Sequence, residues 1–120
     1  NILLNLNNDK TIKEIKLADF GLTKTNNDYS IEEDGTYLYK SPERDNYIYN
    51  TSCDIYSLGI MIYELLNSWS TQMERIKMIT LIKNNPEMID DLQIVKTMIS
   101  IDYIKRPTAK QLLNILQEIF

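Results

Sequence analysis

The stretch that decides the fold reads Leu17-Ala18-Asp19-Phe20-Gly21 and then, after a polar and acidic loop, Gly35-Thr36-Tyr37-Leu38-Tyr39-Lys40-Ser41-Pro42-Glu43. The apolar run before Asp19 is short and rich in strand-forming residues, so it predicts a β-strand that ends at this acid. Asp-Phe-Gly alone consists of three common residues. The information lies in the order of the parts, which is an apolar run, an acid, a polar loop and a closing Ser-Pro-Glu.

Composition bounds the class of protein. The 120 residues are 43% apolar, which suffices for one packed domain and argues against gross disorder. The net charge of −4 and the lack of a long basic run argue against a nucleic-acid binder. A single cysteine, Cys53, cannot form an internal disulfide, so a reducing compartment fits. Because no apolar run reaches the roughly 20 residues of a membrane span, and the start lacks the basic flank of a signal peptide, we expect a cytoplasmic protein without membrane partners.

The stretch around Asp19 and Glu43 resembles the activation segment of a eukaryotic protein kinase, in which an aspartate holds Mg²⁺ against ATP phosphates. Glycines 21, 35 and 59 are the only three in the chain, and all fall within kinase-like motifs. Further motifs follow the kinase order: Asn1-Ile2-Leu3-Leu4 resembles the end of the catalytic loop, Asp54-Ile55-Tyr56-Ser57-Leu58-Gly59 the start of the central helix, and Lys105-Arg106-Pro107-Thr108 the arginine motif.

The resemblance implies a mainly α fold over residues 1–120, the C-terminal lobe of a protein kinase with a short β-hairpin at its start. The small lobe, with its Gly-rich loop and ATP-positioning lysine, is absent from this sequence. The His-Arg-Asp that carries the catalytic base would stand just before Asn1, and the chain contains no histidine. We therefore expect these 120 residues alone to be inactive in phosphoryl transfer and poorly stable.

The resemblance assigns the binding of ATP and Mg²⁺ to Asn1 and Asp19, with Gly21 in a structural role. Two β-prone runs, 2–4 and 15–17, flank a polar turn and predict a hairpin that presents these two residues at its ends. Mg²⁺ takes oxygen ligands, which a carboxylate and an amide carbonyl provide. The alternative is that Asn1 is a frayed terminus and Asp19 an ordinary turn residue.

Gly35-Thr36-x-x-Tyr39 resembles the substrate platform of serine/threonine kinases. The resemblance implies that Thr36 supports the missing catalytic aspartate and that Tyr39 packs the platform onto the lobe. Alternatively, Gly35 only turns the chain and Thr36 only fills space. The acidic run 32–34 is either a solvated turn or a substitute for phosphate charge. The preceding loop contains hydroxyl groups that are either phosphorylation sites or ordinary solvated side chains, namely Thr23, Thr25, Tyr29 and Ser30.

Three residues besides Gly21 are assigned structural roles. The resemblance pairs Glu43 with Arg106 in a buried ion pair, and arginine suits this role because its planar fork meets a carboxylate at two points. Asp54 matches an aspartate that accepts hydrogen bonds from the catalytic-loop backbone. The alternative for Asp54 is an acid that is favoured at the N-terminus of a helix by the helix dipole.

Hydrophobic spacing predicts helices over residues 53–66, 73–83 and 88–101, and from Pro107 onward. The first is apolar nearly all round and is expected to be buried, with Thr51 or Ser52 as its cap. The second is amphipathic and should end at Asn84-Asn85-Pro86. Its expected inner face contains Met73, Ile76, Ile79 (or Thr80) and Lys83. The last helix is expected to be lined by Leu112, Leu113, Ile115, Leu116 and Ile119.

Tyr39-x-Ser-Pro-Glu43, together with Met73-Glu74-Arg75-Ile76 and a Pro86-Glu87 stop, resembles the kinases of the alpha subunit of translation initiation factor two. In those kinases the helix matching 73–83 contacts the substrate, and the threonine matching Thr36 can be phosphorylated. Two functions remain open. The parent is an ATP-dependent protein serine/threonine kinase acting on a protein substrate, as the retained Asn1 and Asp19 favour, or the chain is a truncated or degenerate remnant that only binds partners.

Overall fold

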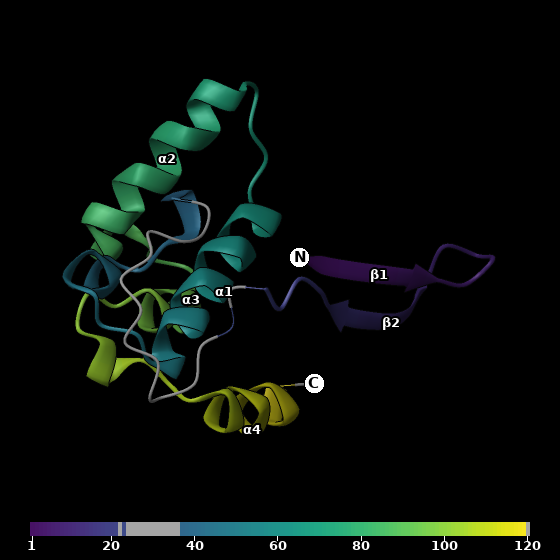
Figure 1. Ribbon diagram of the computed structural model, residues 1–120. Helices are drawn as coiled ribbons and strands as arrows, with labels where there is room; N and C mark the ends of the chain where they lie inside the picture. The colour runs from purple at the N-terminus through teal and green to yellow at the C-terminus, as the bar shows by residue number, and fades with distance from the viewer. Residues whose placement is uncertain (22, 24–36, 120) are drawn as a thin grey trace. The chain divides into compact units, whose positions relative to one another are not determined.

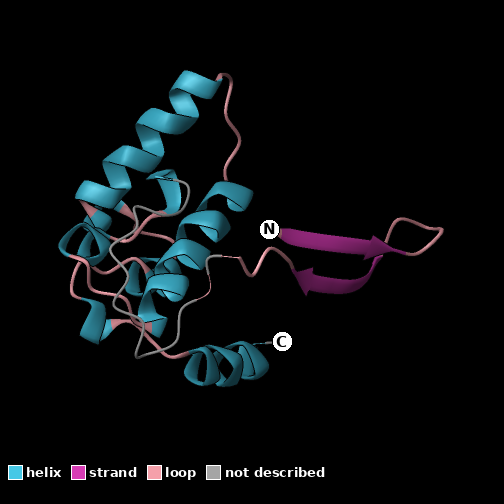
Figure 2. Cartoon of the chain, viewed as in Figure 1, coloured by secondary structure: helices cyan, strands magenta, loops and turns pink. Residues whose placement is uncertain are grey.

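The computed structural model describes residues 1–21, 23 and 37–119, which form two compact units, 1–34 and 35–120 (Figure 1). The secondary structure is mainly helical, with a two-stranded sheet at the start of the chain (Figure 2). This confirms the expected fold class. Within the described ranges, no helix combines the length and the apolar character needed to cross a membrane.

The first unit contains the expected hairpin. Strands β1 (Ile2–Leu6) and β2 (Ile12–Leu17) pair antiparallel, with Ile2 opposite Leu17 and a register shift at the turn end of β1. The polar turn satisfies its own backbone, because Asp9 Oδ1 accepts from the amide of Thr11 at 3.0 Å and from its hydroxyl at 2.6 Å. The pairing extends past the strands, since the Ala18 amide donates to the carbonyl of Asn1 at 2.9 Å.

The second unit begins, among the described residues, with two 3-10 turns, Tyr37–Tyr39 and Pro42–Asn46. Helix α1 (Thr51–Leu66) follows, and its cap is Asn50, whose side chain accepts from the Ser52 amide at 3.0 Å. The expectation that Thr51 or Ser52 caps this helix was wrong, because both already lie inside its first turn. Asparagine is as favourable as serine at this position, since its short side chain reaches the free amides of the first turn.

Helix α1 is buried along most of its length, as the sequence predicted, but its last residues, Leu65 and Leu66, are exposed. Helix α3 (Gln93–Met98) packs against it at Gly59. A β-carbon at Gly59 would lie 2.7 Å from Ile99 Cγ2 and 2.9 Å from Met98 Cβ. The missing side chain therefore allows the close approach of α1 to the end of α3.

Helix α2 (Gln72–Asn84) ends at the predicted Asn-Asn-Pro stop, and Thr71 caps its start by accepting from the Glu74 amide. Its inner face agrees with the predicted one in part, since Ile79 is buried and Lys83 is half-buried. Met73 and Ile76 are exposed, whereas Ile79 and Ile82 are buried against α1 and its neighbours. The prediction was wrong for Met73 and Ile76, because a helix with apolar residues on several sides does not identify its inner face by spacing alone.

The segment before Asp102 is less helical than its spacing predicted. A 3-10 turn covers Pro86–Met88, and helix begins again only at Gln93, so 88–101 is not one helix. Ile89 is nevertheless buried in the core although it lies outside both elements. The apolar spacing in residues 88–101 indicates which residues are buried, and an irregular backbone can bury them as well as a helix can.

Helix α4 (Ala109–Ile119) starts after Pro107 as expected, with Thr108 accepting from the Gln111 amide and Gln111 accepting in return from the Thr108 amide. Leu112 is buried against Ile55 and Met98. The other described apolar residues that were expected to line this helix are largely exposed, namely Leu113, Ile115 and Leu116. The side chain of Ile119 lies outside the described residues.

Candidate functional site

The two expected metal ligands lie at the open end of the hairpin. The hydrogen bond from the Ala18 amide to the Asn1 carbonyl closes this end beyond the last strand pair, Ile2 with Leu17, so Asn1 lies against Ala18, the residue before Asp19. Both residues are exposed. Asp19 has a φ of 64°, in the left-handed region, and this turns the chain sharply after β2. A non-glycine residue held in this conformation is a reasonable candidate for a functional position.

The donor set at this end of the hairpin fits a hard cation. An amide oxygen and a carboxylate are suitable for Mg²⁺, which in phosphate-binding sites takes one or two protein ligands and completes its shell with phosphate oxygens and water. Across the described part of the chain, no group of three or more acidic, cysteine or histidine side chains forms a cage for a metal ion. A β-carbon at Gly21 would lie 3.5 Å from Asp19 Oδ1, an ordinary van der Waals contact, so Gly21 lies directly beside the carboxylate. The ligand roles of Asn1 and Asp19 stay predictions.

The expected platform residue Thr36 lies outside the described residues, as do Gly35, the acidic run 32–34 and three of the hydroxyl candidates, Thr25, Tyr29 and Ser30. Thr23 is described, and its amide donates to the carbonyl of Phe20 at 3.0 Å. Asp54 is exposed in the first turn of α1, where a carboxylate is favoured by the helix dipole. Its proposed contact to a catalytic loop stays a prediction.

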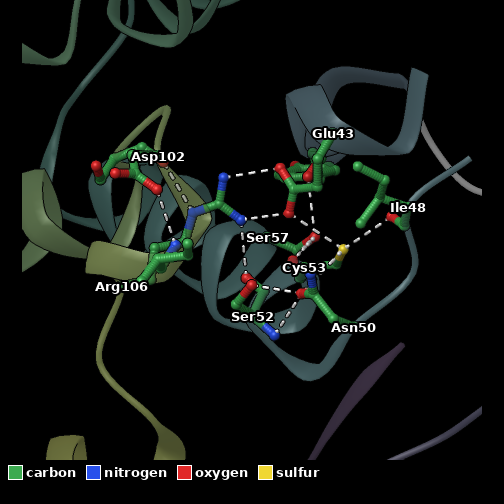
Figure 3. A network of polar contacts seen from close by, with 11 residues as sticks. Glu43, Ile48, Asn50, Ser52, Cys53, Ser57, Asp102 and Arg106 are labelled. Atoms are coloured by element: carbon green, nitrogen blue, oxygen red, sulfur yellow. Dashed lines mark hydrogen bonds and ion pairs between the residues drawn. The ribbon is translucent and has the colours of Figure 1, made fainter. Parts of the chain in front are cut away.

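The ion pair expected between Glu43 and Arg106 is present and buried (Figure 3). Arg106 Nη1 donates to Glu43 Oε1 at 2.6 Å and Nη2 donates to Oε2 at 2.8 Å, so the fork meets the carboxylate at both oxygens. The side chain of Arg106 is 0% exposed and that of Glu43 is 5% exposed. Arg106 also donates to the carbonyls of Ser52 and Ser100. All the charge on this pair is therefore matched within the protein.

The surroundings of the pair explain its electrostatics. Burial alone raises the pKa of the Glu43 carboxyl, but the hydrogen bonds that it accepts, led by those from Arg106, outweigh burial and leave the pKa below its ordinary value. The Cys53 thiol donates to Glu43 Oε1 at 3.2 Å, a contact the sequence did not indicate. The guanidinium carbon of Arg106 lies 4.7 Å from the centroid of the Tyr56 ring, in cation–π range. The pair thus joins the end of the Ser-Pro-Glu stretch to the start of α1 and to the segment before α4.

A second polar cluster surrounds Tyr39 and was not predicted in full. The Tyr39 hydroxyl donates to Glu64 Oε2 at 2.6 Å and accepts from Arg75 Nη2 at 2.9 Å, while Arg75 Nε donates to Glu64 Oε1. The Ser57 hydroxyl donates to the Tyr39 carbonyl at 2.9 Å. Packing of Tyr39 onto the helices was expected, and these contacts show which residues provide it. Arg75 and Glu64 are ordinary charges on helices in the sequence, and only three-dimensional proximity distinguishes them.

Comparison with known proteins gives a consistent result. The model of the family described as protein kinase domain matches residues 1–116. The chain is 31% identical, over 85% of its length, to the eIF-2-alpha kinase GCN2 of Schizosaccharomyces pombe. It is 34% identical over 82% to eukaryotic translation initiation factor 2-alpha kinase 1 of the same yeast, and 32% identical over 83% to kinase 3 of Rattus norvegicus. The chain spans 8%, 17% and 11% of the lengths of these relatives.

Proposed function

Because this chain belongs to the protein kinase domain family, we propose that it is part of an ATP-dependent serine/threonine kinase that phosphorylates the alpha subunit of translation initiation factor 2. The observation that carries the proposal is the family match over residues 1–116, which includes every motif position assigned above. The substrate class is supported by the printed names of several relatives, which are kinases of this subunit.

In this proposal, Asn1 and Asp19 bind Mg²⁺ and thereby ATP. When bound, Mg²⁺ neutralises the charge that develops on the transferred phosphoryl group. The hairpin positions the side chains of Asn1 and Asp19, since the hydrogen bond from the Ala18 amide to the Asn1 carbonyl fixes the backbone at its open end.

The second unit would position the protein substrate. Thr36 would support the catalytic aspartate, and Tyr39, held by Glu64 and Arg75, would hold the platform against the helices. The buried pair of Glu43 and Arg106 would anchor the end of the same segment. Catalysis in this class of enzyme is almost entirely positioning and electrostatic stabilisation, so these anchors bear directly on rate.

The test begins with the natural protein, purified from its own cells, whose mass and N-terminal sequence show how the chain extends before Asn1. The purified protein is then incubated with Mg²⁺, ATP labelled at the γ-phosphate and the recombinant alpha subunit. We expect label on serine or threonine of the subunit, by phosphoamino-acid analysis. Asp19→Asn should abolish labelling without lowering the melting temperature, whereas the matched control Glu14→Gln, an exposed carboxylate on β2, should leave it unchanged.

Labelling of other proteins but not of this subunit would refute the substrate assignment. A natural protein that begins at Asn1 and labels no protein would refute the enzyme and favour the binding remnant.

A further inference from the structure

The last turn of helix α2 contains a lysine that forms no ion pair with any residue in the described part of the second unit. Lys83 is half-buried, and its Nζ donates a hydrogen bond to the carbonyl of Tyr37 at 3.0 Å. The same Nζ lies 5.1 Å from the centroid of the Tyr37 ring, in cation–π range. The carbonyl and the ring hold the ammonium in place, but neither provides a formal negative charge.

The acid whose charge acts on Lys83 is bonded to a different lysine. Asp45 lies close enough to affect the ionisation of Lys83, but its carboxylate forms an ion pair with Lys40 Nζ at 2.8 Å. The charge of Lys40 also acts on Lys83. The side chain of Asp45 is 62% exposed, and an ion pair with so exposed a member contributes little stability. Two lysine charges therefore act beside one weakly held carboxylate.

The electrostatics of Lys83 agree with this geometry. Burial lowers the pKa of the Lys83 ammonium, and the charge of Lys40 lowers it further, although Asp45 opposes both effects. The ammonium is therefore less stable here than in water, and an anion that binds beside it would stabilise its charged form. A lysine that is perturbed by burial and by a neighbouring like charge is a candidate for a functional position.

The ammonium of Lys83 is oriented and still has donors to offer. It has three N–H groups, and the hydrogen bond to the Tyr37 carbonyl uses one of them. The side chain of Tyr37 is 77% exposed, so solvent reaches the turn at this point. A cation that is already fixed in place loses little conformational freedom when a ligand binds to it. These features fit an anion that approaches from solvent.

We propose that Lys83 and Lys40 bind the phosphoryl group of a phosphate monoester beside the Tyr37–Tyr39 turn, where the phosphoryl oxygens replace the carboxylate of Asp45 at Lys40. Lysine recognises phosphate as a compact point charge. At neutral pH a phosphate monoester has a charge of about −1.5 to −2, which matches two ammonium groups better than one carboxylate does. The inference goes beyond the proposed function, because this binding needs neither ATP nor phosphoryl transfer.

The test follows the two lysines by NMR in the full-length natural protein, produced with lysine that is labelled with carbon-13 at the ε carbon. Inorganic phosphate is added without ATP or Mg²⁺, at an ionic strength kept constant with sodium chloride. We expect the signals of Lys83 and Lys40 to shift and saturate, with a dissociation constant on the order of 1 mM. The pKa of Lys83 should rise as phosphate binds, because the anion stabilises the ammonium.

Three variants, each followed at the Lys40 signal, give results of different sign. Lys83→Met should weaken phosphate binding about tenfold, because it removes one charge-assisted contact. The matched control Lys77→Met removes an exposed lysine of the same helix and should leave binding unchanged. Asp45→Asn should tighten binding about threefold, because it removes the anion that competes at Lys40. Poor folding of a variant cannot imitate this set, since it would not tighten binding.

Equal weakening by Lys83→Met and Lys77→Met, or the same signal changes with chloride alone, would overturn the inference and show an adventitious ion only. Weaker binding in Asp45→Asn would also overturn it.

A short phosphoserine peptide, with its unphosphorylated form as the control, identifies the source of the phosphoryl group. Tighter binding of the phosphopeptide than of inorganic phosphate would assign the site to a phosphorylated protein chain, and equal binding would assign it to small phosphate esters. A phosphopeptide that does not bind would overturn the inference. Because no step of this test uses ATP, failure of the protein to phosphorylate the alpha subunit would count against the proposed function and not against this site.

Discussion

Replacing Arg106 with alanine should be among the most damaging single changes in this chain. The substitution leaves the carboxylate of Glu43, which is 5% exposed, with the Cys53 thiol as its remaining side-chain donor among the described residues. It also removes the donor to the carbonyls of Ser52 and Ser100. Breaking a buried ion pair from one side costs roughly 3–5 kcal/mol, because the remaining charge is stranded away from water.

The neighbouring cation provides the matched control. Lys105 is 74% exposed in its side chain and lies 3.9 Å from Asp102, so its removal should cost less than about 1 kcal/mol. Urea unfolding of the natural protein measures both effects. With slopes of about 1–3 kcal/mol per molar, Arg106→Ala should lower the unfolding midpoint by on the order of 2 M, and Lys105→Ala should barely move it.

Two results would refute this reasoning. The first is an equal shift of the midpoint for Arg106→Ala and Lys105→Ala. The second concerns the paired variant Glu43→Leu with Arg106→Met, which removes both charges and keeps apolar volume. It should be clearly more stable than Arg106→Ala, because no charge is left buried alone. If it is less stable, the cost comes from lost packing and not from the stranded carboxylate.

Three further expectations use the same unfolding measurement. Gly59→Ala should lower the free energy of unfolding by about 1–3 kcal/mol, because the new carbon would lie 2.7 Å from Ile99 Cγ2. The control variant Lys110→Ala, which places alanine at an exposed helical position, should not lower it in this way. Tyr56→Phe should be neutral or stabilising by about 1 kcal/mol, since the Tyr56 hydroxyl is buried without a hydrogen-bond partner among the described residues; a large loss would contradict this. The lowered pKa of Glu43 means that its contribution is complete above its unfolded value of 4.5 and is lost as the pH falls toward its lower folded value, so the acid sensitivity of stability should shrink in Glu43→Leu with Arg106→Met.

The sequence predicted best where a motif names both partners of a contact. Glu43 and Arg106 are 63 residues apart, and no local pattern joins them, yet the kinase resemblance paired them and the structure contains the pair. The long apolar helix α1 was also predictable, since a segment that is apolar on all sides has to be buried.

Prediction from the sequence failed where several residues have the same chemical suitability and only the backbone conformation or the packing of the helices selects one of them. Asn50, Thr51 and Ser52 are all good capping residues, and only the backbone conformation, extended at Asn50, selects one. The contact of Arg75 with Tyr39 depends on how α2 crosses α1, which residue spacing does not encode. The short α3 shows the same limit, because apolar spacing reports which residues are buried and not the backbone that buries them.

The long sequence separation of Glu43 and Arg106 has a consequence for the order of folding. Forming the ion pair closes a loop of 63 residues, and this closure has an entropic cost. Contacts between residues so far apart in the sequence therefore tend to form late in folding. We expect the pair to be absent from the folding transition state, and to stabilise the folded domain mainly by slowing its unfolding. Loss of Arg106 should then speed unfolding many-fold while leaving the refolding rate nearly unchanged, in stopped-flow measurements across urea concentrations. A slower refolding rate would place the pair in the nucleus instead. Arg106 would then mainly determine the unfolding rate of the domain, and so how long the domain stays folded.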